Sequence, residues 1–524
     1  MLVYIHSAKC VGIEALPVTV EVDITRGIGI HLVGLADAAV KESLLRTVTA
    51  LQSKGFHIPG KKVVINLAPA DMHKSGSGYD LPIALGILSG SGQIELPRLG
   101  DFLILGELGL DGSVRYVRGS LPVVEYAREQ GFAGCILPEE SALEAVEFRG
   151  TAIYGVRNLD DVFRILSGEA ADDRLIWNTE RYRNAREAAR SVRPDAMDFS
   201  EIVGQEGAKR GVEIAAAGGH NVILIGPPGS GKSSLAKAMA AILPPMTLEE
   251  ALVTSKIYSV AGRRDAHCGL IRQRPFRSPH ISSSLPALLG GGSGDNLQPG
   301  EVSLAQNGIL FLDEYCEAPK SILEGLRAPL EDRCVTISRL KAKLRYPASF
   351  ILVAASNPCP CGYFGEGDRC SCTAGQRASY LAKLSGPVLD RIDLQLTVPP
   401  VPAAALLERG GKRRETSAAV AARVARAREI QRQRFAGESI FTNAEMGNRQ
   451  LERFCPLSKE CTAVLEQIIQ RLGLSARAYT RILKVARTIA DLEAGDGNPG
   501  AMEPRHLIEA AGYRFLDRRR LMEA

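Results

Sequence analysis

The segment Asn221–Ser234 reads NVILIGPPGSGKSS, and it decides the fold of the central part of the chain. A short apolar run, VILI, precedes the pattern G-x-x-x-x-G-K-S, and the helix-forming stretch SSLAKAMAAIL follows it. A buried strand, a glycine-rich loop and a helix in this order are typical of an α/β domain that binds nucleotides. The sequence therefore predicts a parallel-sheet domain with a phosphate-binding loop.

Each residue type in this loop has a chemical reason. Glycines let backbone N–H groups turn towards phosphate oxygens, and the helix start adds partial positive charge. Lys232 is predicted to reach the β- and γ-phosphates, and the Ser233 hydroxyl to bind Mg²⁺. The predicted ATP-binding residues are Gly226, Pro227, Pro228, Gly229, Ser230, Gly231, Lys232, Ser233 and Ser234.

A second predicted strand, GILFLDE at 308–314, ends in two carboxylates. Asp313 can hold Mg²⁺ through water, and Glu314 can orient and deprotonate the attacking water. The pair favours hydrolysis over binding alone; a strand that ends in a solvated acidic turn is the structural alternative.

Three more polar residues are candidates for contact with the nucleotide. Asn357 follows the strand SFILVAAS and can hydrogen-bond the water or the γ-phosphate. Arg391, between two aspartates in GPVLDRIDL, is either a surface ion-pair residue or a finger that enters a neighbouring subunit's ATP site. Arg477 opens the predicted helix RAYTRILKVARTIADL, from which it can reach the γ-phosphate as part of a lid.

Four of the eleven cysteines form a cluster with the spacing C-x-C, eight residues, C-x-C. Four thiolates on one short loop can bind Zn²⁺ tetrahedrally and close a segment too polar to fold alone. Four reduced surface thiols are the alternative. The predicted zinc ligands are Cys359, Cys361, Cys370 and Cys372.

The chain divides into five parts by composition. Strand-like and helical segments alternate over residues 1–165, and the polar segment 166–197 is predicted to be a linker. The nucleotide domain covers 198–402. A basic helical connector (403–436) and a helical lid (437–524) follow it. We expect an α/β fold class overall, with an α+β unit at the N-terminus.

Basic residues suggest two contacts with an anionic polymer. Between Arg409 and Arg434 there are nine basic and two acidic residues, which indicates either a nucleic-acid contact or a solvated helix. The stretch 335–346, VTISRLKAKLRY, predicts a β-hairpin with Arg339, Lys341 and Lys343 near its tip. Basic tips can track phosphates without reading bases, although a solvated charged turn is the simpler interpretation.

The order of these motifs resembles the AAA+ ATPases, and more narrowly their magnesium-chelatase-like branch. Five segments are similar to the ComM/YifB family, and the resemblance covers nearly the whole chain. They are RPFRSPH (274–280), GGGS (290–293), PGEVSLAQNGILFLDE (299–314), NPCPCGYFG (357–365) and ARTIADL (486–492). The chain departs from the family at SPHIS (278–282) and DEYCEA (313–318), which flank the chemistry.

The resemblance implies roles for single residues. Lys232 and Ser233 would be Walker A, Asp313 and Glu314 Walker B, Asn357 sensor 1, Arg391 the arginine finger and Arg477 sensor 2, with Arg481 as a second candidate. Ile202 and Val203 would border the adenine. The hairpin, and 290–294 as a second loop, would face a central pore.

The resemblance also implies a function, with ATP and Mg²⁺ as cofactors. We expect a hexameric DNA translocase or helicase that extends heteroduplexes by branch migration during transformation, with single-stranded or branched DNA and recombination proteins as partners. The alternatives are the motor of a metal-chelatase complex and an ATP-dependent unfoldase or protease. The N-terminus lacks an export signal and no 18-residue apolar run occurs, so we expect a cytoplasmic location without a membrane contact.

The N-terminal part resembles the proteolytic (S5-type) domain of the Lon family through 74–88, KSGSGYDLPIALGIL, and 106–131. Aligning the Ser–Lys dyad puts Gly78 at the nucleophile position and Leu121 at the lysine position, with Ser77 one residue away. A dyad needs a hydroxyl activated by an amine, so we expect a structural platform rather than a peptidase.

Overall fold

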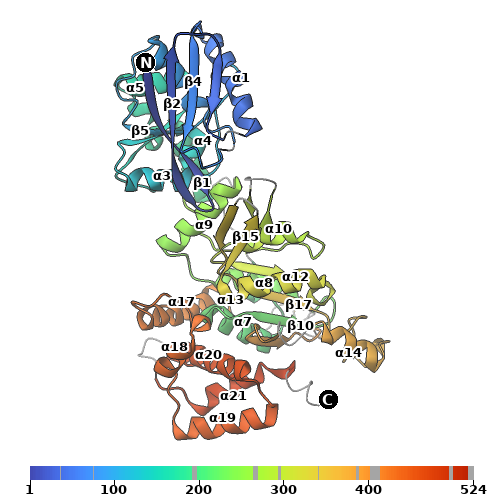
Figure 1. Cartoon of the computed structure of the whole chain (residues 1–524). Helices are drawn as coiled ribbons and strands as arrows, with labels where there is room; N and C mark the ends of the chain where they lie inside the picture. Colours follow the sequence, from blue (N-terminus) through green and yellow to red (C-terminus); the bar gives the residue numbers. More distant parts are fainter. Residues whose placement is uncertain are drawn as a thin grey trace.

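The computed structural model describes residues 1–35, 37–74, 76–191, 197–263, 269–292, 297–339, 342–384, 389–401, 414–494 and 500–516. Figure 1 shows an N-terminal sheet domain, a central nucleotide domain and a C-terminal helical domain, one after another. The α/β class and the helical C-terminal region predicted from the sequence are confirmed. Among the described residues, no helix is both long and apolar enough to cross a membrane.

The N-terminal domain contains a mixed seven-stranded sheet in the order β3-β4-β2-β1-β5-β8-β9. Its strands are β1 (Leu2–Val11), β2 (Glu14–Thr25), β3 (Ile30–Val33), β4 (Lys62–Ala68), β5 (Phe102–Ile104), β8 (Gly134–Pro138) and β9 (Ala152–Val156). The hairpin β1–β2 is antiparallel from Leu2 opposite Asp23 to Val11 opposite Glu14. Beside the sheet, β6 (Glu107–Leu108) and β7 (Val114–Arg115) form a short ribbon.

Helices complete this domain: α1 (Ala38–Ser53), α2 (Asp80–Ser91), α3 (Ser120–Glu129), α4 (Glu139–Ala142) and α5 (Leu159–Ser167). Residues 80–88 of α2 are all buried: the buried residues after Asp80 are apolar on every side of the helix, and the Asp80 carboxylate pairs with Arg46. At Gly86 a Cβ would lie 2.4 Å from a methyl carbon of Val22, so only glycine lets α2 approach the sheet this closely.

The predicted linker differs from expectation in its first half. Ile176 is fully buried, and the Trp177 indole N–H donates to the Val146 carbonyl at 2.7 Å. These two apolar side chains hold the segment on the N-terminal domain, and α6 (Glu180–Ser191) follows as a helix.

The central domain contains a parallel five-stranded sheet in the order β11-β14-β17-β10-β18. The strands are β11 (Phe276–Arg277), β14 (Ile309–Leu312), β17 (Ile351–Ser356), β10 (Val222–Ile225) and β18 (Leu394–Thr397). Alternate residues enter two separate cores: Val222 and Leu224 pack on one face, and Ile223 and Ile225 on the other. Both faces are therefore covered, and function belongs at the strand ends.

Helices and short strands surround this sheet. They are α7 (Glu206–Gly218), α8 (Lys232–Ile242), α9 (Leu248–Ala261), α10 (Leu285–Leu289), β12 (Gly290–Gly291), β13 (Gln298–Pro299), α11 (Glu301–Leu304), α12 (Lys320–Gly325), α13 (Arg327–Asp332), β15 (Cys334–Arg339), β16 (Ala342–Pro347) and α14 (Ala374–Ala382). Figure 1 shows α14 at one side of this domain, away from the N-terminal sheet.

The C-terminal helices are α17 (Ser417–Arg434), α18 (Asn448–Phe454), α19 (Lys459–Leu472), α20 (Ala476–Glu493) and α21 (Pro504–Gly512). Several arginines of α17 make internal contacts: Arg423 pairs with Glu213, and Arg434 with Asp491. Arg428 donates to the Ala216 carbonyl at 2.8 Å. These arginines hold α17 against the rest of the protein, which matches neither expectation, a nucleic-acid contact or a solvated helix; residues 402–413 lie outside the described residues.

Helix α9 joins the N-terminal domain to the central domain by packing against α3. Glu144 accepts hydrogen bonds from Ser120 at 2.7 Å, from Ser259 of α9 at 2.5 Å and from the Tyr116 hydroxyl at 3.0 Å. Lys256 of α9 also forms an ion pair with Glu125 of α3. A carboxylate with three hydroxyl donors therefore lies at the joint between the domains.

Candidate functional site

The phosphate-binding loop connects β10 to α8 at the carboxyl end of the sheet. At Gly226 a Cβ would lie 2.1 Å from the Val398 carbonyl oxygen, so the loop can begin there only with glycine. Gly229 and Gly231 have φ of +76° and +92°, which turn the backbone around the space for the phosphates. The loop predicted from the sequence thus has the expected strand–loop–helix context.

Lys232 occupies the centre of this loop. Its ammonium donates to the Gly226 and Pro227 carbonyls at 2.7 and 2.9 Å, and to Asn357 Oδ1 at 3.2 Å. Burial lowers the pKa of Lys232, although the nearby carboxylates of Asp313 and Glu314 oppose that shift. A cation held partly out of water is ready to exchange loop carbonyls for phosphate oxygens.

The magnesium ligands predicted from the sequence also meet. The Ser233 hydroxyl donates to Asp313 Oδ2 at 3.1 Å, which brings together the two oxygen ligands of a Walker-type metal site. Glu314 follows directly and is exposed, with a left-handed φ of +49°. Such a conformation costs free energy in a non-glycine residue and is typical of functional positions.

The residues present fit a triphosphate with Mg²⁺. Ser230 Oγ is buried and has no hydrogen-bond partner among the described residues, although it belongs to the loop that would surround an anion. Hydroxyl, ammonium and carboxylate groups therefore converge from β10, β14 and β17 at one sheet edge. When bound, MgATP would supply the phosphoryl group, and these residues would hold and orient it.

Sequence reasoning missed one residue of this site. The Gln205 side-chain amide donates to the carbonyls of Pro399 and Ser230, at 2.5 and 3.3 Å. It ties the segment of Ile202 and Val203 to the loop, and Ile202 is buried in the domain core. The only signal for Gln205 in the sequence was its place two residues after Val203.

Arg391 lies at the amino ends of the parallel strands, opposite the end that carries the phosphate-binding loop. Its carbonyl accepts from Asn221 Nδ2 at 3.0 Å, and Asn221 directly precedes β10, whereas the phosphate-binding loop follows β10. Four residues of strand separate these ends by about 13 Å. The Arg391 guanidinium pairs instead with Glu331 of α13.

Arg477 and Arg481 lie with Arg391 and not beside Lys232. All three line one cavity of about 120 Å³ together with Lys484. Arg477 contacts Asp390 at 3.5 Å, and Arg481 pairs with the buried Asp393 at 3.0 Å.

Four basic side chains line this cavity together with the carboxylates of Glu331 and Asp390. Although burial opposes ionisation of Asp393, Arg481 and His220 hold the pKa of its carboxyl well below the usual range. Burial, and then Arg481, lower the pKa of Lys484 to about 8. The excess of basic over acidic side chains leaves this cavity able to contact an anionic group.

The four cysteines of the predicted metal site do converge, and their Sγ atoms all lie within 4.8 Å of one another. The Sγ atom of Cys361 lies 3.3 Å from that of Cys359 and 3.6 Å from that of Cys370, and the distance from Cys359 to Cys370 is 3.9 Å. Zinc–sulfur bonds of about 2.3 Å in a tetrahedron require sulfur atoms about 3.8 Å apart. The donor set therefore fits a tetrahedral zinc ion.

The predicted hairpin is present as β15 and β16, which pair from Cys334 opposite Pro347 to Arg339 opposite Ala342. Lys343 is exposed on β16. The structure does not describe Lys341 or the Arg339 side chain. Residues 293 and 294 of the second predicted pore loop also lie outside the described residues.

The positions of the Ser–Lys dyad carry no catalytic groups. Leu121 is buried, and its backbone N–H donates to Ser259 Oγ of α9 at 3.4 Å. Ser77 hydrogen-bonds the Glu107 carboxylate rather than an amine, and Lys74 donates to the Pro69 carbonyl. In the part of the chain that the structure describes, Ser77 thus makes no hydrogen bond with an amine that could activate it as a nucleophile.

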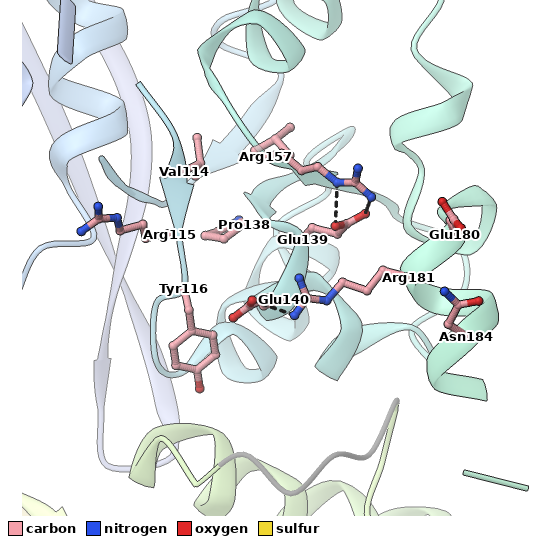
Figure 2. A pocket seen from close by; sticks show the side chains of 11 residues that line it. Val114, Arg115, Tyr116, Pro138, Glu139, Glu140, Arg157, Glu180, Arg181 and Asn184 are labelled. Carbon is pink, nitrogen blue, oxygen red and sulfur yellow. Dashed lines mark hydrogen bonds and ion pairs between the residues drawn. The ribbon is translucent and has the colours of Figure 1, made fainter. Parts of the chain in front are cut away.

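The N-terminal domain also contains a cavity of about 750 Å³ beside α6. Figure 2 shows two pairs among its charged side chains, with Arg115 and Glu180 apart from them: Arg157 donates to both Glu139 oxygens at 2.9 and 3.1 Å, and Arg181 to Glu140 at 2.7 Å. These pairs satisfy one another, so the cavity is not assigned a ligand.

Three family models match the chain: "Magnesium chelatase, subunit ChlI" over residues 198–406, "Subunit ChlI of Mg-chelatase" over 20–141, and "Magnesium chelatase, subunit ChlI C-terminal" over 414–514. The chain is 42% identical over 519 residues to the competence protein ComM of Haemophilus influenzae, covering 99% of this chain and 98% of that protein. It is 41% identical to YifB of Salmonella typhimurium, with the same coverage. An archaeal Lon protease of Methanocaldococcus jannaschii is 27% identical over 146 residues, 28% of this chain and 22% of that protease.

Proposed function

Because this chain belongs to the ComM/YifB family of magnesium-chelatase-like AAA+ proteins, we propose that it is a ring-forming, ATP-driven DNA translocase that promotes branch migration. The family is one of ATPases that use ATP and Mg²⁺. The name of the full-length relative ComM links that protein to competence, and it supports a role in processing DNA taken up by transformation.

The observation that carries the ATPase part is the convergence of Lys232, Asp313 and Asn357 at one sheet edge. Lys232 would hold the β- and γ-phosphates, and Ser233 with Asp313 would bind the metal. Glu314 would accept the proton of the attacking water, which Asn357 would help to orient.

The observation that carries the ring is the position of Arg391. The backbone contact with Asn221 fixes this residue at the sheet edge that lacks the phosphate-binding loop. An arginine there can neutralise transition-state charge only at a neighbouring subunit's triphosphate. Arg477 and Arg481 share its cavity, and we place them in the same intersubunit site. Six subunits are the ring size that the family resemblance suggests.

Measuring ATP hydrolysis without DNA and with single-stranded, duplex or four-way-junction DNA tests the proposed function. A translocase is expected to hydrolyse ATP faster with its DNA substrate, and to convert junctions into products only when ATP is hydrolysed. Equal rates under all conditions would contradict the proposal. Stimulation by a partner subunit and a porphyrin instead of DNA would indicate a chelatase motor, and degradation of casein would indicate a protease.

The β15–β16 hairpin is the proposed DNA contact. Replacing Lys341 and Lys343 together with alanine removes two phosphate-binding charges, so we expect weaker DNA affinity and a salt dependence of log Kd that is lower by about 2. Fluorescence anisotropy at several salt concentrations measures both, and basal ATP hydrolysis serves as the control. DNA affinity equal to that of the unmodified protein would place the contact elsewhere.

We further propose that the cysteine cluster holds a structural zinc ion. Elemental analysis of the purified protein is expected to find about one zinc per chain, the stoichiometry of a closed four-thiolate site. Replacing Cys370 and Cys372 with serine is expected to abolish it, whereas replacing Cys334, outside the cluster, should not. Zinc-free protein whose fold is unaffected by chelators would refute the assignment.

A further inference from the structure

The loop that carries the cysteines lies directly against the ATP site. Cys359 is only two residues from Asn357, which accepts a hydrogen bond from Lys232. Gly362 packs on the phosphate-binding loop so closely that a Cβ would lie 2.8 Å from Pro228 Cδ, and 3.7 Å from the Asn357 side chain. One glycine of the cysteine loop thus contacts both the loop that binds phosphate and sensor 1.

Few other interactions fix this loop. Between Cys359 and Cys372 its one regular element is a single 3₁₀ turn, Gly367–Arg369. Its aromatic residues pack on nearby arginines, with Arg369 over Tyr363 and Arg377 over Phe364. The first contact lies within the loop, and the second joins the loop to α14, whose Arg377 also donates to the Cys372 carbonyl at 2.8 Å. The buried Cys359 and the contact of Gly362 with Pro228 join the loop to the ATP site itself.

We propose that the metal-bound cysteine loop is a brace for the ATP site: by holding Gly362 against Pro228, it positions the phosphate-binding loop and Asn357 for hydrolysis. The proposal rests on the ATPase and zinc parts of the proposed function and not on the DNA part. Thiolate–metal bonds crosslink both ends of the polar segment, and without them its conformational freedom rises. A displacement of about 1 Å at a catalytic group can lower turnover by about 100-fold.

Two matched glycine variants separate the brace from general loop stability. Gly362 and Gly365 have φ of +87° and +95°, so alanine strains the backbone at either position. Only at position 362 does the added methyl meet Pro228, because nothing lies within 4 Å of a Cβ at Gly365. The G362A variant is expected to keep its zinc and to lose about tenfold or more in kcat, with weaker binding of a fluorescent ADP. The G365A variant should retain both properties.

Metal removal tests the same brace without a substitution at the ATP site. Chelator-treated protein, and the variant with serine at 370 and 372, are expected to lose zinc and kcat together. Adding zinc back should restore kcat only in the chelator-treated protein. Substituting Co²⁺ should give thiolate charge-transfer absorbance, which reports the site independently of activity.

The outcomes distinguish this proposal from the proposed function. Zinc-free protein with unchanged kcat and ADP affinity, or G362A with properties equal to those of G365A, would overturn the brace even if DNA stimulates hydrolysis. Conversely, if kcat falls when zinc is removed but DNA does not change the rate of ATP hydrolysis, the brace is supported and the translocase is contradicted. If the serine variant does not fold, as judged by circular dichroism, the G362A and G365A pair still decides.

Discussion

Replacing Glu314 with glutamine is expected to lower kcat for ATP hydrolysis by about 10²–10⁴-fold, the usual contribution of a positioned general base. Nucleotide affinity should hardly change, because Lys232, Ser233 and Asp313 make the contacts that hold phosphate and metal. The side chain is exposed and makes no buried ion pair that the structure describes, so the variant should fold as the native protein does. Single-turnover hydrolysis and fluorescent-nucleotide binding measure the two quantities.

Glu317 offers a matched control for this variant. It lies three residues further on, is 46% exposed, and pairs with Lys383 on the surface. Replacing it with glutamine makes the same charge change without touching the ATP site, and turnover should stay at the native rate. If E314Q hydrolysed ATP as fast as E317Q, another group would be the base.

The second large effect is expected at Arg391. Replacing it with alanine should lower hydrolysis by about 10³-fold, as for other arginine fingers. Its partner Glu331 is 59% exposed, so the carboxylate left behind can be hydrated; because Arg391 itself is buried, circular dichroism should accompany the measurement to show that the variant folds. Replacing Arg505, a 65% exposed surface arginine of α21, with alanine serves as the control.

Mixing variants tests whether Arg391 acts between subunits. A ring site built from the R391A subunit still has Glu314, and an E314Q neighbour still has Arg391. In an equal random mixture of the two inactive variants, about a quarter of the sites should regain both groups. No recovery of hydrolysis on mixing, in rings shown to exchange subunits, would mean that the arginine serves its own subunit or none.

Much of the nucleotide site could be predicted because local sequence determines it. The strand VILI, the glycine loop and the residues after GILFL lie at strand ends, and parallel strands bring such ends to one edge of the sheet. The cysteine cluster was predictable for the same reason, since all four ligands lie on a single loop.

Contacts between distant segments were not predictable in this way. The pairing of Arg391 with Glu331, and the position of Arg477 beside them, depend on how the lid packs, which no local pattern encodes. The segment 166–197 was predicted to be a linker because it is polar. Two apolar side chains, Ile176 and Trp177, nevertheless hold its first half on the N-terminal domain. Gly362 gave no signal, because its importance comes from the proline that it touches.

The contact of Leu121 with Ser259 has a mechanical meaning. In a working peptidase the corresponding surface would have to stay open for a polypeptide to enter. Here α9, a helix of the central domain, packs against it and is joined to the N-terminal domain by hydroxyl groups around Glu144. If α9 tilts during ATP hydrolysis, the N-terminal domain would therefore move together with it.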